Sequence, residues 1–335
     1  MSAEPPSRGR LRDRGAEWVP ASVRSRSGPL ALALTGILWG SIGVAVRLLQ
    51  DASLSPLVIA FWRMVCACAV LTPLVGRRGM ADLAAAARRP YRLLAVALGS
   101  LTFQLLYFVA VRDVGVAVAT LVTLGLAPVA SILYEAARNR RAPAPATLAV
   151  LACALTGLAL VATAGGADVG TAPRPALGLA EAAAAALAYA GTTELSGPLS
   201  TRLGAFHITA ATSAVAVVLL LPAVLLLGPG VPASPRVLGG LVWLGVVTTV
   251  VAYGLFYAGL RTTPGSVAMV LTLLEPATAV VLAALVLGEP VPWAGGLGAA
   301  LLLLAVAVLS LAAPGREPRA GPDLGAPPLP HDRTG

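Results

Sequence analysis

Residues 265–287 form one unbroken apolar run, GSVAMVLTLLEPATAVVLAALVL, in which Glu275 is the only charged residue. At 1.5 Å per residue, a helix of this length extends about 35 Å, whereas the hydrocarbon core of a bilayer is about 30 Å thick. An ionisable side chain near the centre of such a helix costs about 2.5–3.5 kcal/mol on insertion scales. The stretch therefore predicts a membrane-spanning helix, and the cost of its acidic residue indicates that Glu275 has a structural or functional role.

Nine further apolar runs lie on either side of this one. The ten predicted spans are 30–49, 57–75, 93–111, 115–134, 146–164, 177–193, 207–227, 237–260, 265–287 and 293–312. Only 12% of the residues are charged, about half the share found in soluble proteins. We therefore predict an all-α polytopic membrane protein with ten transmembrane helices. The ends, 1–29 and 313–335, are rich in Pro, Gly, Ser and Arg and are predicted to be disordered tails.

The positions of the arginines predict the orientation of the chain. All 24 basic residues are Arg, and cytoplasmic loops of membrane proteins carry an excess of them. With the N-terminus inside, nineteen Arg fall in cytoplasmic segments and only Arg112, Arg174 and Arg236 in external loops. We predict that both termini are cytoplasmic, in the plasma membrane. Because most Arg lie between apolar runs, the net charge of +9 is explained by topology, and no nucleic-acid partner is expected.

Two stretches align without a gap when the chain is shifted by 148 residues. Residues 108–128 read FVAVRDVGVAVATLVTLGLAP, and residues 256–276 read FYAGLRTTPGSVAMVLTLLEP, so that Pro128 meets Pro276. Each half then holds five spans, an odd number, and the second half must be inverted relative to the first. Inverted repeats around a midplane site are a recurring transporter design.

The loop charges agree with this inversion. The loop after the fourth span holds Arg138, Arg140 and Arg141, whereas the loop after the ninth span, which inversion places outside, holds no Arg. The predicted organisation is a first five-helix repeat at 30–164, an external linker at 165–176 and a second repeat at 177–312.

Several short motifs carry a resemblance to a known family. They are Trp39-Gly40-Ser41, Phe61-Trp62-Arg63, Ala127-Pro128, Leu274-Glu275-Pro276 and Leu287-Gly288-Glu289. With ten spans in two halves, residues 30–312 resemble the drug/metabolite transporter superfamily, and specifically its EamA-type transporters. The family often has a Gly-Glu-like turn after span 4, where this chain has Asn139-Arg140-Arg141. The resemblance implies a secondary transporter that moves small metabolites, commonly amino acids or related solutes, usually outward.

Glu275 is the deepest acid of the chain, and Pro276 follows it directly. Proline removes a helical hydrogen bond and clashes with the carbonyl four residues back, so a helix break is predicted there, and another at Pro128. A broken helix exposes backbone polar groups, which is tolerated where they line a cavity. Glu275 is either a proton or substrate-amine site, or a structural acid that pairs with an Arg or caps the kink.

Arg63 lies inside the second predicted span. Its planar guanidinium suits a substrate carboxylate, and the alternative is a charge pair with Glu181 or Glu275. Glu181 lies near the outer end of span 6, where an interfacial acid is the simpler interpretation. His207 lies at the start of span 7 and is likewise interpreted as an interfacial residue.

Two polar stripes lie on spans 3 and 8. The first is Ser100, Gln104 and Tyr107, and the second is Thr249, Tyr253 and Tyr257. Residues three or four apart share one helix face, and polar faces in lipid turn toward other helices or water. We predict that both stripes line one central cavity, with interhelical hydrogen bonding as the alternative. Trp39 and Tyr189 are candidates for aromatic walls of the same cavity.

Other classes of function have less support. The acids are scattered, and neither a Ser-His-Asp set nor an HExxH motif is present, which disfavours a membrane-embedded enzyme. No GxxxxGK[ST] loop is present, so direct coupling to ATP is not expected. We expect no cofactor and no metal. The expected partners are a small-molecule substrate and the lipid bilayer, and transport is expected to be coupled to protons. A permease or exchanger of the same architecture, and a non-transporting scaffold, remain as alternatives.

Overall fold

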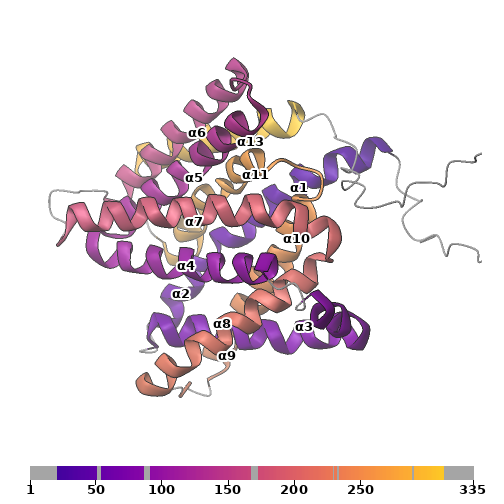
Figure 1. Cartoon of the computed structure of the whole chain (residues 1–335). Coiled ribbons are helices and arrows are strands. Elements are labelled where there is room, and N and C mark those ends of the chain that lie inside the picture. The colour runs from indigo at the N-terminus through magenta and orange to yellow at the C-terminus, as the bar shows by residue number, and fades with distance from the viewer. Residues whose placement is uncertain are drawn as a thin grey trace, which may run out of the picture.

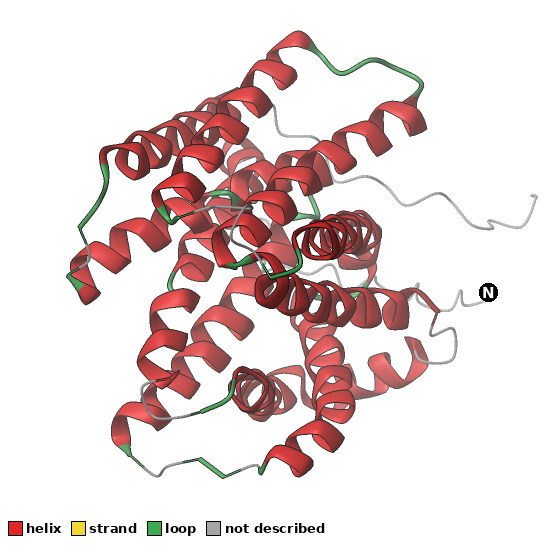
Figure 2. Cartoon of the chain, turned by 90° about the vertical axis from the view of Figure 1, so that its left-hand side faces the viewer, coloured by secondary structure: helices red, strands yellow, loops and turns green. Residues whose placement is uncertain are grey.

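The computed structural model describes residues 21–50, 54–86, 91–166, 173–228, 230–231, 234–288 and 290–312. The predicted tails at 1–20 and 313–335, and Glu289 of the last family motif, lie outside these residues. Within them the elements of secondary structure are all helices, joined by loops and turns, and no strand is present (Figure 2). This agrees with the all-α prediction.

The helices fall into two halves of five spans. The first half consists of α1 (Ala21–Gly40) with α2 (Ile42–Gln50), α3 (Pro56–Ala86), α4 (Tyr91–Val114), α5 (Val116–Asn139) and α6 (Pro145–Ala164). The second consists of α7 (Pro175–Arg202), α8 (Ala205–Leu227), α9 (Pro235–Val242) with η1 (Trp243–Val251) and α10 (Ala252–Gly259), α11 (Gly265–Thr272) with α12 (Leu274–Leu287), and α13 (Trp293–Ala312). Three spans thus consist of more than one helical segment.

Within the part of the chain that the structure describes, nine of the ten spans are long and apolar enough to cross a bilayer. The remaining span, α7, is 28 residues long but carries the charged residues Glu181, Glu194 and Arg202. It packs against α4, α5, α10 and α11, and so lies among other helices (Figure 1). Exposed leucines and valines elsewhere, such as Leu226 and Leu285, cover faces suited to lipid.

The two halves are inverted repeats. If each span is replaced by its counterpart in the other half, the main contacts between helices are reproduced. The contact of α4 with α7 corresponds to that of α10 with α1, and the contact of α4 with α8 corresponds to that of η1 with α3. The pairs α3 with α8 and α6 with α13 map onto themselves. Five crossings in each half require opposite orientations, as the sequence predicted.

Close backbone approaches follow the same symmetry. A Cβ on Gly178 at the start of α7 would lie 2.6 Å from Val114 Cβ at the end of α4. A Cβ on Gly28 in α1 would lie 3.3 Å from the carbonyl oxygen of Gly259 at the end of α10. Glycine is needed at both places because a side chain would separate the two halves.

Helix α1 begins earlier than expected. Residues 21–29, assigned above to a disordered tail, form its first part, and Pro29 lies within the helix. Gly28 and Pro29 are buried, and a Cβ on Gly28 would lie 2.7 Å from Thr263 Oγ1. Packing against the turn after α10 therefore extends the helix beyond the apolar run, a tertiary effect that composition alone did not reveal.

Candidate functional site

Two adjoining pockets lie between the repeats. Each is small, with room for about one water molecule, and the empty space in and around them amounts to roughly 340 and 300 Å³ when open solvent is included. The first is lined by Met64, Ala97, Ser100, Leu101, Gln104, Thr209, Thr212, Ser213, Ala216, Thr249 and Tyr253. The second is lined by Ser100, Phe103, Tyr189, Thr192, Thr193, Ser196, Tyr253, Phe256 and Tyr257. Ser100 and Tyr253 belong to both, so the pockets form one cavity with a shared wall, here called the central cavity.

Most of the two predicted stripes line this cavity. Ser100 and Gln104 contribute from α4, Thr249 from η1, and Tyr253 and Tyr257 from α10. The first pocket is edged by hydroxyl groups and an amide, and the second is mainly aromatic. Such walls suit a small solute that carries both polar and apolar groups.

Tyr257 is a buried aromatic residue whose hydroxyl group has several polar neighbours. It is 1% exposed, and its hydroxyl group lies within hydrogen-bonding reach of Ser100, Ser196 and Thr212. These residues come from α4, α7 and α8, so the hydroxyl group faces polar side chains of three helices at the cavity wall.

Tyr107 takes a different position from the rest of its stripe. Its hydroxyl group lies 2.7 Å from Thr120 Oγ1, which belongs to α5. It lines neither pocket. For this residue the interhelical hydrogen bond, which was the alternative interpretation, describes the geometry.

Arg63 forms a hydrogen bond with the cavity wall instead of an ion pair with an acid. Its Nη2 donates to Gln104 Oε1 at 2.8 Å, and the Gln104 Nε2 donates to the Ser100 carbonyl oxygen at 3.2 Å. Its Nε is buried and has no hydrogen-bond acceptor. Neither Glu181 nor Glu275 forms an ion pair with it in the described part of the chain. The guanidinium group therefore keeps hydrogen-bonding capacity for a ligand or a water molecule.

Trp39 lies behind the cavity wall. Its ring contacts Tyr253 at a centroid distance of 5.0 Å, and its Nε1 donates to the Thr248 carbonyl oxygen at 3.2 Å. A shift of 150 residues relates this ring pair to Tyr189 and Phe103, which stack at 4.8 Å. Tyr189 and Phe103 line the second pocket, so the repeats supply similar ring pairs that have different access to the cavity.

The ninth span is interrupted next to Glu275. Helix α11 ends at Thr272, Leu273 forms a turn, and α12 begins at Leu274, so the interruption precedes Pro276 by two to three residues. A proline cannot supply the N–H that would bond to the Thr272 carbonyl, which explains the position of the interruption.

Helix α1 packs directly against this interruption. A Cβ on Gly36 would lie 3.0 Å from the Thr272 carbonyl oxygen, and one on Gly40 would lie 2.7 Å from the Glu275 carbonyl oxygen. The first span is itself interrupted at Ser41, between α1 and α2. Two broken spans, one from each repeat, therefore meet beside the central cavity.

Glu275 lies in the first turn of α12, and its side chain is partly accessible. It is close enough to Tyr107, Tyr189 and Tyr253 to interact with them electrostatically. Of these, Tyr189 and Tyr253 line the cavity, so the acid lies close to the cavity wall. It lines neither pocket directly.

The predicted break at Pro128 is absent. Helix α5 runs without interruption from Val116 to Asn139 with Pro128 inside it. Membrane helices keep their course through a proline when neighbouring helices and local adjustment satisfy the freed carbonyl. Ala127 and Pro128 are both buried against such neighbours. The aligned prolines of the two repeats thus have different consequences.

Part of the eighth span is a π-helix, which the sequence did not predict. Segment η1 carries Thr248 and Thr249, whose hydroxyl groups both donate to the Leu244 carbonyl oxygen, at 2.8 and 2.9 Å. Such segments occur often at functional sites. Here Thr249 contributes to the wall of the first pocket.

Sequence reasoning also missed the polar contribution of α7 and α8. Thr209, Thr212 and Ser213 line the first pocket, and Thr192 and Ser196 line the second. Thr209 is three and four positions from Thr212 and Ser213, and Thr192 is four from Ser196, the spacing that identified the stripes of spans 3 and 8. The same signal was therefore present in these helices.

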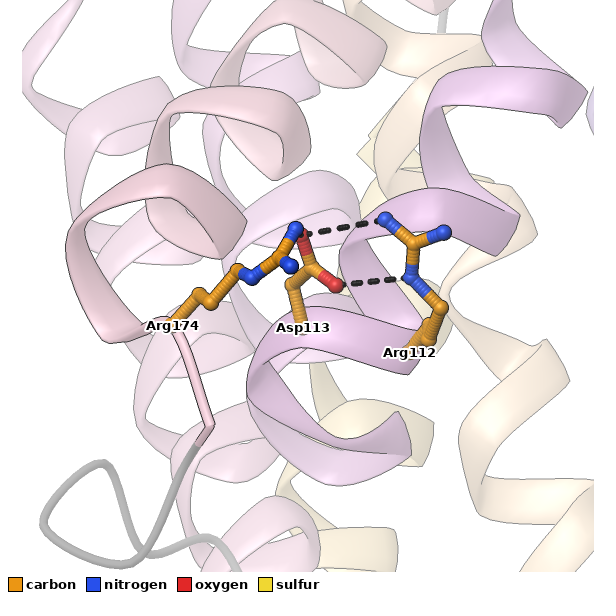
Figure 3. A network of polar contacts seen from close by, with 3 residues as sticks. All are labelled: Arg112, Asp113 and Arg174. Atoms are coloured by element: carbon orange, nitrogen blue, oxygen red, sulfur yellow. Dashed lines mark hydrogen bonds and ion pairs between the residues drawn. The ribbon is translucent and has the colours of Figure 1, made fainter.

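An ion network joins the repeats at one end of the fold. Asp113 in α4 is 3% exposed and lies between Arg112 and Arg174 (Figure 3). Its carboxylate accepts from Arg112 Nε at 2.8 Å and lies 4.0 Å from Arg174 Nη1. Its carbonyl oxygen accepts from the Arg174 N–H at 3.1 Å. The network connects the end of α4 with the start of α7.

In the described part of the chain, no three His, Cys, Asp or Glu side chains gather in a way that could hold a metal ion.

Comparison with known proteins identifies the family of this chain. The sequence profile of the EamA-like transporter family matches residues 26–163 and again residues 176–311. The chain belongs to the EamA-like transporter family.

One curated relative and one solved structure are similar to this chain. The "Uncharacterized transporter YwfM" of Bacillus subtilis (strain 168) is 29% identical over 210 residues, which are 63% of this chain and 70% of the relative. A solved structure described as "Crystal structure of protein" superposes with a TM-score of 0.70 at 23% identity, over 86% of this chain and 98% of that one. The second likeness concerns the fold alone.

Membership in the EamA-like family makes this protein a multi-pass membrane transporter. The two profile matches coincide with the two halves of the fold, one match for each five-span repeat. The central cavity between those repeats is then the candidate site for the transported solute.

Proposed function

We propose that this EamA-like transporter is a secondary carrier of the plasma membrane that exports a small metabolite, such as an amino acid or a related polar solute, in exchange for protons. The observation that supports this most strongly is the central cavity, which both repeats line and which lies beside two interrupted spans. Carriers of this design bind solute between repeats and expose it alternately to the two sides.

The chemistry of the walls supports a solute with a polar or anionic group. Gln104 and Thr249 offer an amide and a hydroxyl group in the first pocket. The Nη2 of Arg63 donates a hydrogen bond to Gln104, and Arg63 thus places a positive charge behind that wall. A guanidinium group favours carboxylates. The aromatic second pocket would then accept the less polar part of the solute.

Glu275 is the proposed coupling residue. It is partly accessible, and it takes part in none of the ion pairs formed by the described residues. A carboxylate in this setting can take up a proton without first breaking an ion pair. Its place at the start of α12 would link protonation to the interruption of the ninth span.

The excess of arginine in alternate loops supports the proposed orientation, with both termini in the cytoplasm. The outward direction of transport follows the family resemblance. The cavity would serve an importer or an exchanger of the same fold equally well, and this is the alternative that the experiment has to separate.

Deletion and overexpression with metabolite profiling of cells and medium would identify the solute and its direction. An exporter depletes its solute from cells and enriches it in the medium when overexpressed, and an importer does the reverse. The identified solute is then loaded into proteoliposomes under an imposed proton gradient. Loss of gradient dependence in Glu275→Gln is expected. Glu181→Gln is the matched control, because Glu181 lies in the uninterrupted helix α7, whereas Glu275 lies beside the interruption of the ninth span. Unchanged coupling in Glu275→Gln would remove that residue from the proposed role.

A further inference from the structure

The interruption of the first span is stabilised by a serine and a tryptophan. Ser41 lies between α1 and α2, and its hydroxyl group donates to the Leu38 carbonyl oxygen at 2.7 Å. The same hydroxyl group accepts from Trp243 Nε1 at 3.0 Å. Ser41 thus satisfies a carbonyl at the interruption and presents its oxygen to the partner repeat, because Trp243 is the first residue of η1.

A second indole bond runs in the opposite direction. Trp39 of α1 donates to the Thr248 carbonyl oxygen of η1, while Trp243 of η1 donates to Ser41. One bond is made by Ser41 at the interruption itself, and the other by Trp39, two residues before it. They also connect it to the cavity wall, because Thr249 follows Thr248 and lines the first pocket.

The corresponding place in the other half lacks this arrangement. A shift of 150 residues, which relates Trp39 to Tyr189, relates Ser41 to Gly191 and Trp243 to Leu93. Gly191 and Leu93 have no side-chain groups that could form the bond. Helix α7 also runs without interruption through Gly191. The interruption and the serine–tryptophan bond therefore occur together in one repeat and are both absent from the other.

We propose that the Ser41–Trp243 hydrogen bond is the pivot about which the two repeats move, and that Trp243 is a positioning residue for transport. Trp243 is 45% exposed and lines neither pocket, so it acts without touching solute. Few-residue hinges at helix ends commonly absorb the change of angle in such motions. This role assumes that solute crosses through the central cavity, as proposed above.

The test uses the full-length protein in proteoliposomes and in lipid nanodiscs. Trp243→Phe keeps the ring and removes the N–H, and Ser41→Ala removes the acceptor. Ser41→Thr keeps a hydroxyl group and serves as the rescue variant. Trp293→Phe is the matched control, because Trp293 is 78% exposed at the start of α13. Flux is measured against solute concentration, and hydrogen–deuterium exchange is followed across residues 38–46.

A pivot predicts that Trp243→Phe and Ser41→Ala each lower the maximal rate by about two- to tenfold, the range for one hydrogen bond, with the KM unchanged. The double variant is then no slower than either single one, and Ser41→Thr restores the rate. Exchange across residues 38–46 rises in the two impaired variants and not in Trp293→Phe.

Other results overturn the proposal. A raised KM at full maximal rate would make Trp243 part of binding, and additive losses in the double variant would mean that the two residues act separately. Unchanged exchange across residues 38–46 would show that the bond does not hold the interruption. If no variant, including the wild type, moves solute, the proposed function fails, while the exchange measurement still decides whether the bond stabilises the interruption.

Discussion

Replacing Gly40 by alanine tests how closely the two interrupted spans are packed. A Cβ at Gly40 would lie 2.7 Å from the Glu275 carbonyl oxygen and 2.5 Å from Thr278 Cβ. The first neighbour is backbone, which cannot rotate away as the end of a long side chain can. Overpacking of this kind costs about 1–3 kcal/mol. Gly40→Ala is therefore expected to push α12 away from α1 and to destabilise the fold.

Gly43 provides the control within the same span. A Cβ there would meet no heavy atom within 4 Å. Alanine in a helix is more stable than glycine by about 0.5–1 kcal/mol, so Gly43→Ala is expected to be neutral or stabilising. Gly40 is also helical and receives the same gain, so the free energies of unfolding of the two variants should differ by the cost of overpacking, about 1–3 kcal/mol.

Unfolding of the purified protein in mixed detergent micelles, with increasing SDS and monitored by circular dichroism, measures this difference. The account predicts a lower midpoint for Gly40→Ala than for both Gly43→Ala and the wild type. Flux in proteoliposomes should fall in the same variant, because the start of α12 carries Glu275. Equal midpoints for the two alanine variants would refute the close approach of α1 to the interrupted ninth span.

Further predictions concern the cavity wall and the ion network. Gln104→Leu should lower the free energy of unfolding by about 1–3 kcal/mol, because Arg63 loses its hydrogen-bond acceptor. Gln104→Glu keeps an acceptor and should not lower it. Unfolding of both variants in SDS compares them. Tyr257→Phe should raise the KM for the solute, because the cavity loses a hydroxyl group that faces three polar side chains; a flux titration with an unchanged KM would contradict this. Asp113→Asn should lower the thermal midpoint more than Arg174→Ala, because the carboxylate is buried and the arginine side chain is 64% exposed. Equal shifts would show that Asp113 is not the centre of the network.

The spans were readable from the sequence because a bilayer imposes length and apolarity on every helix that crosses it. The predicted runs agree with the observed spans to within a few residues at most ends, as at 265–287 and Gly265–Leu287. The inversion was also readable, because odd crossings and loop arginines are properties of the chain itself. What depends on contacts between distant residues was not, and the early start of α1 is one example.

The same distinction applies to the site. Helical spacing grouped Ser100 with Gln104 and Thr249 with Tyr253, and the structure places all four around the first pocket, because each pair shares a helix face. It did not reveal that Arg63 would bond to Gln104, since that choice depends on how α3 and α4 pack. Nor did it reveal the different behaviour of Pro128, whose effect depends on its neighbours.

Solute counterflow through protein with a blocked cavity tests the central claim most directly. Ser100 lines both pockets, whereas Thr102, two residues along α4, is exposed on the opposite face. Ser100→Trp fills the cavity, and Thr102→Trp adds the same ring to the lipid-facing side. The account predicts counterflow in the wild type and in Thr102→Trp, and its loss in a folded Ser100→Trp protein. Normal counterflow in Ser100→Trp would mean that solute does not cross between the two repeats.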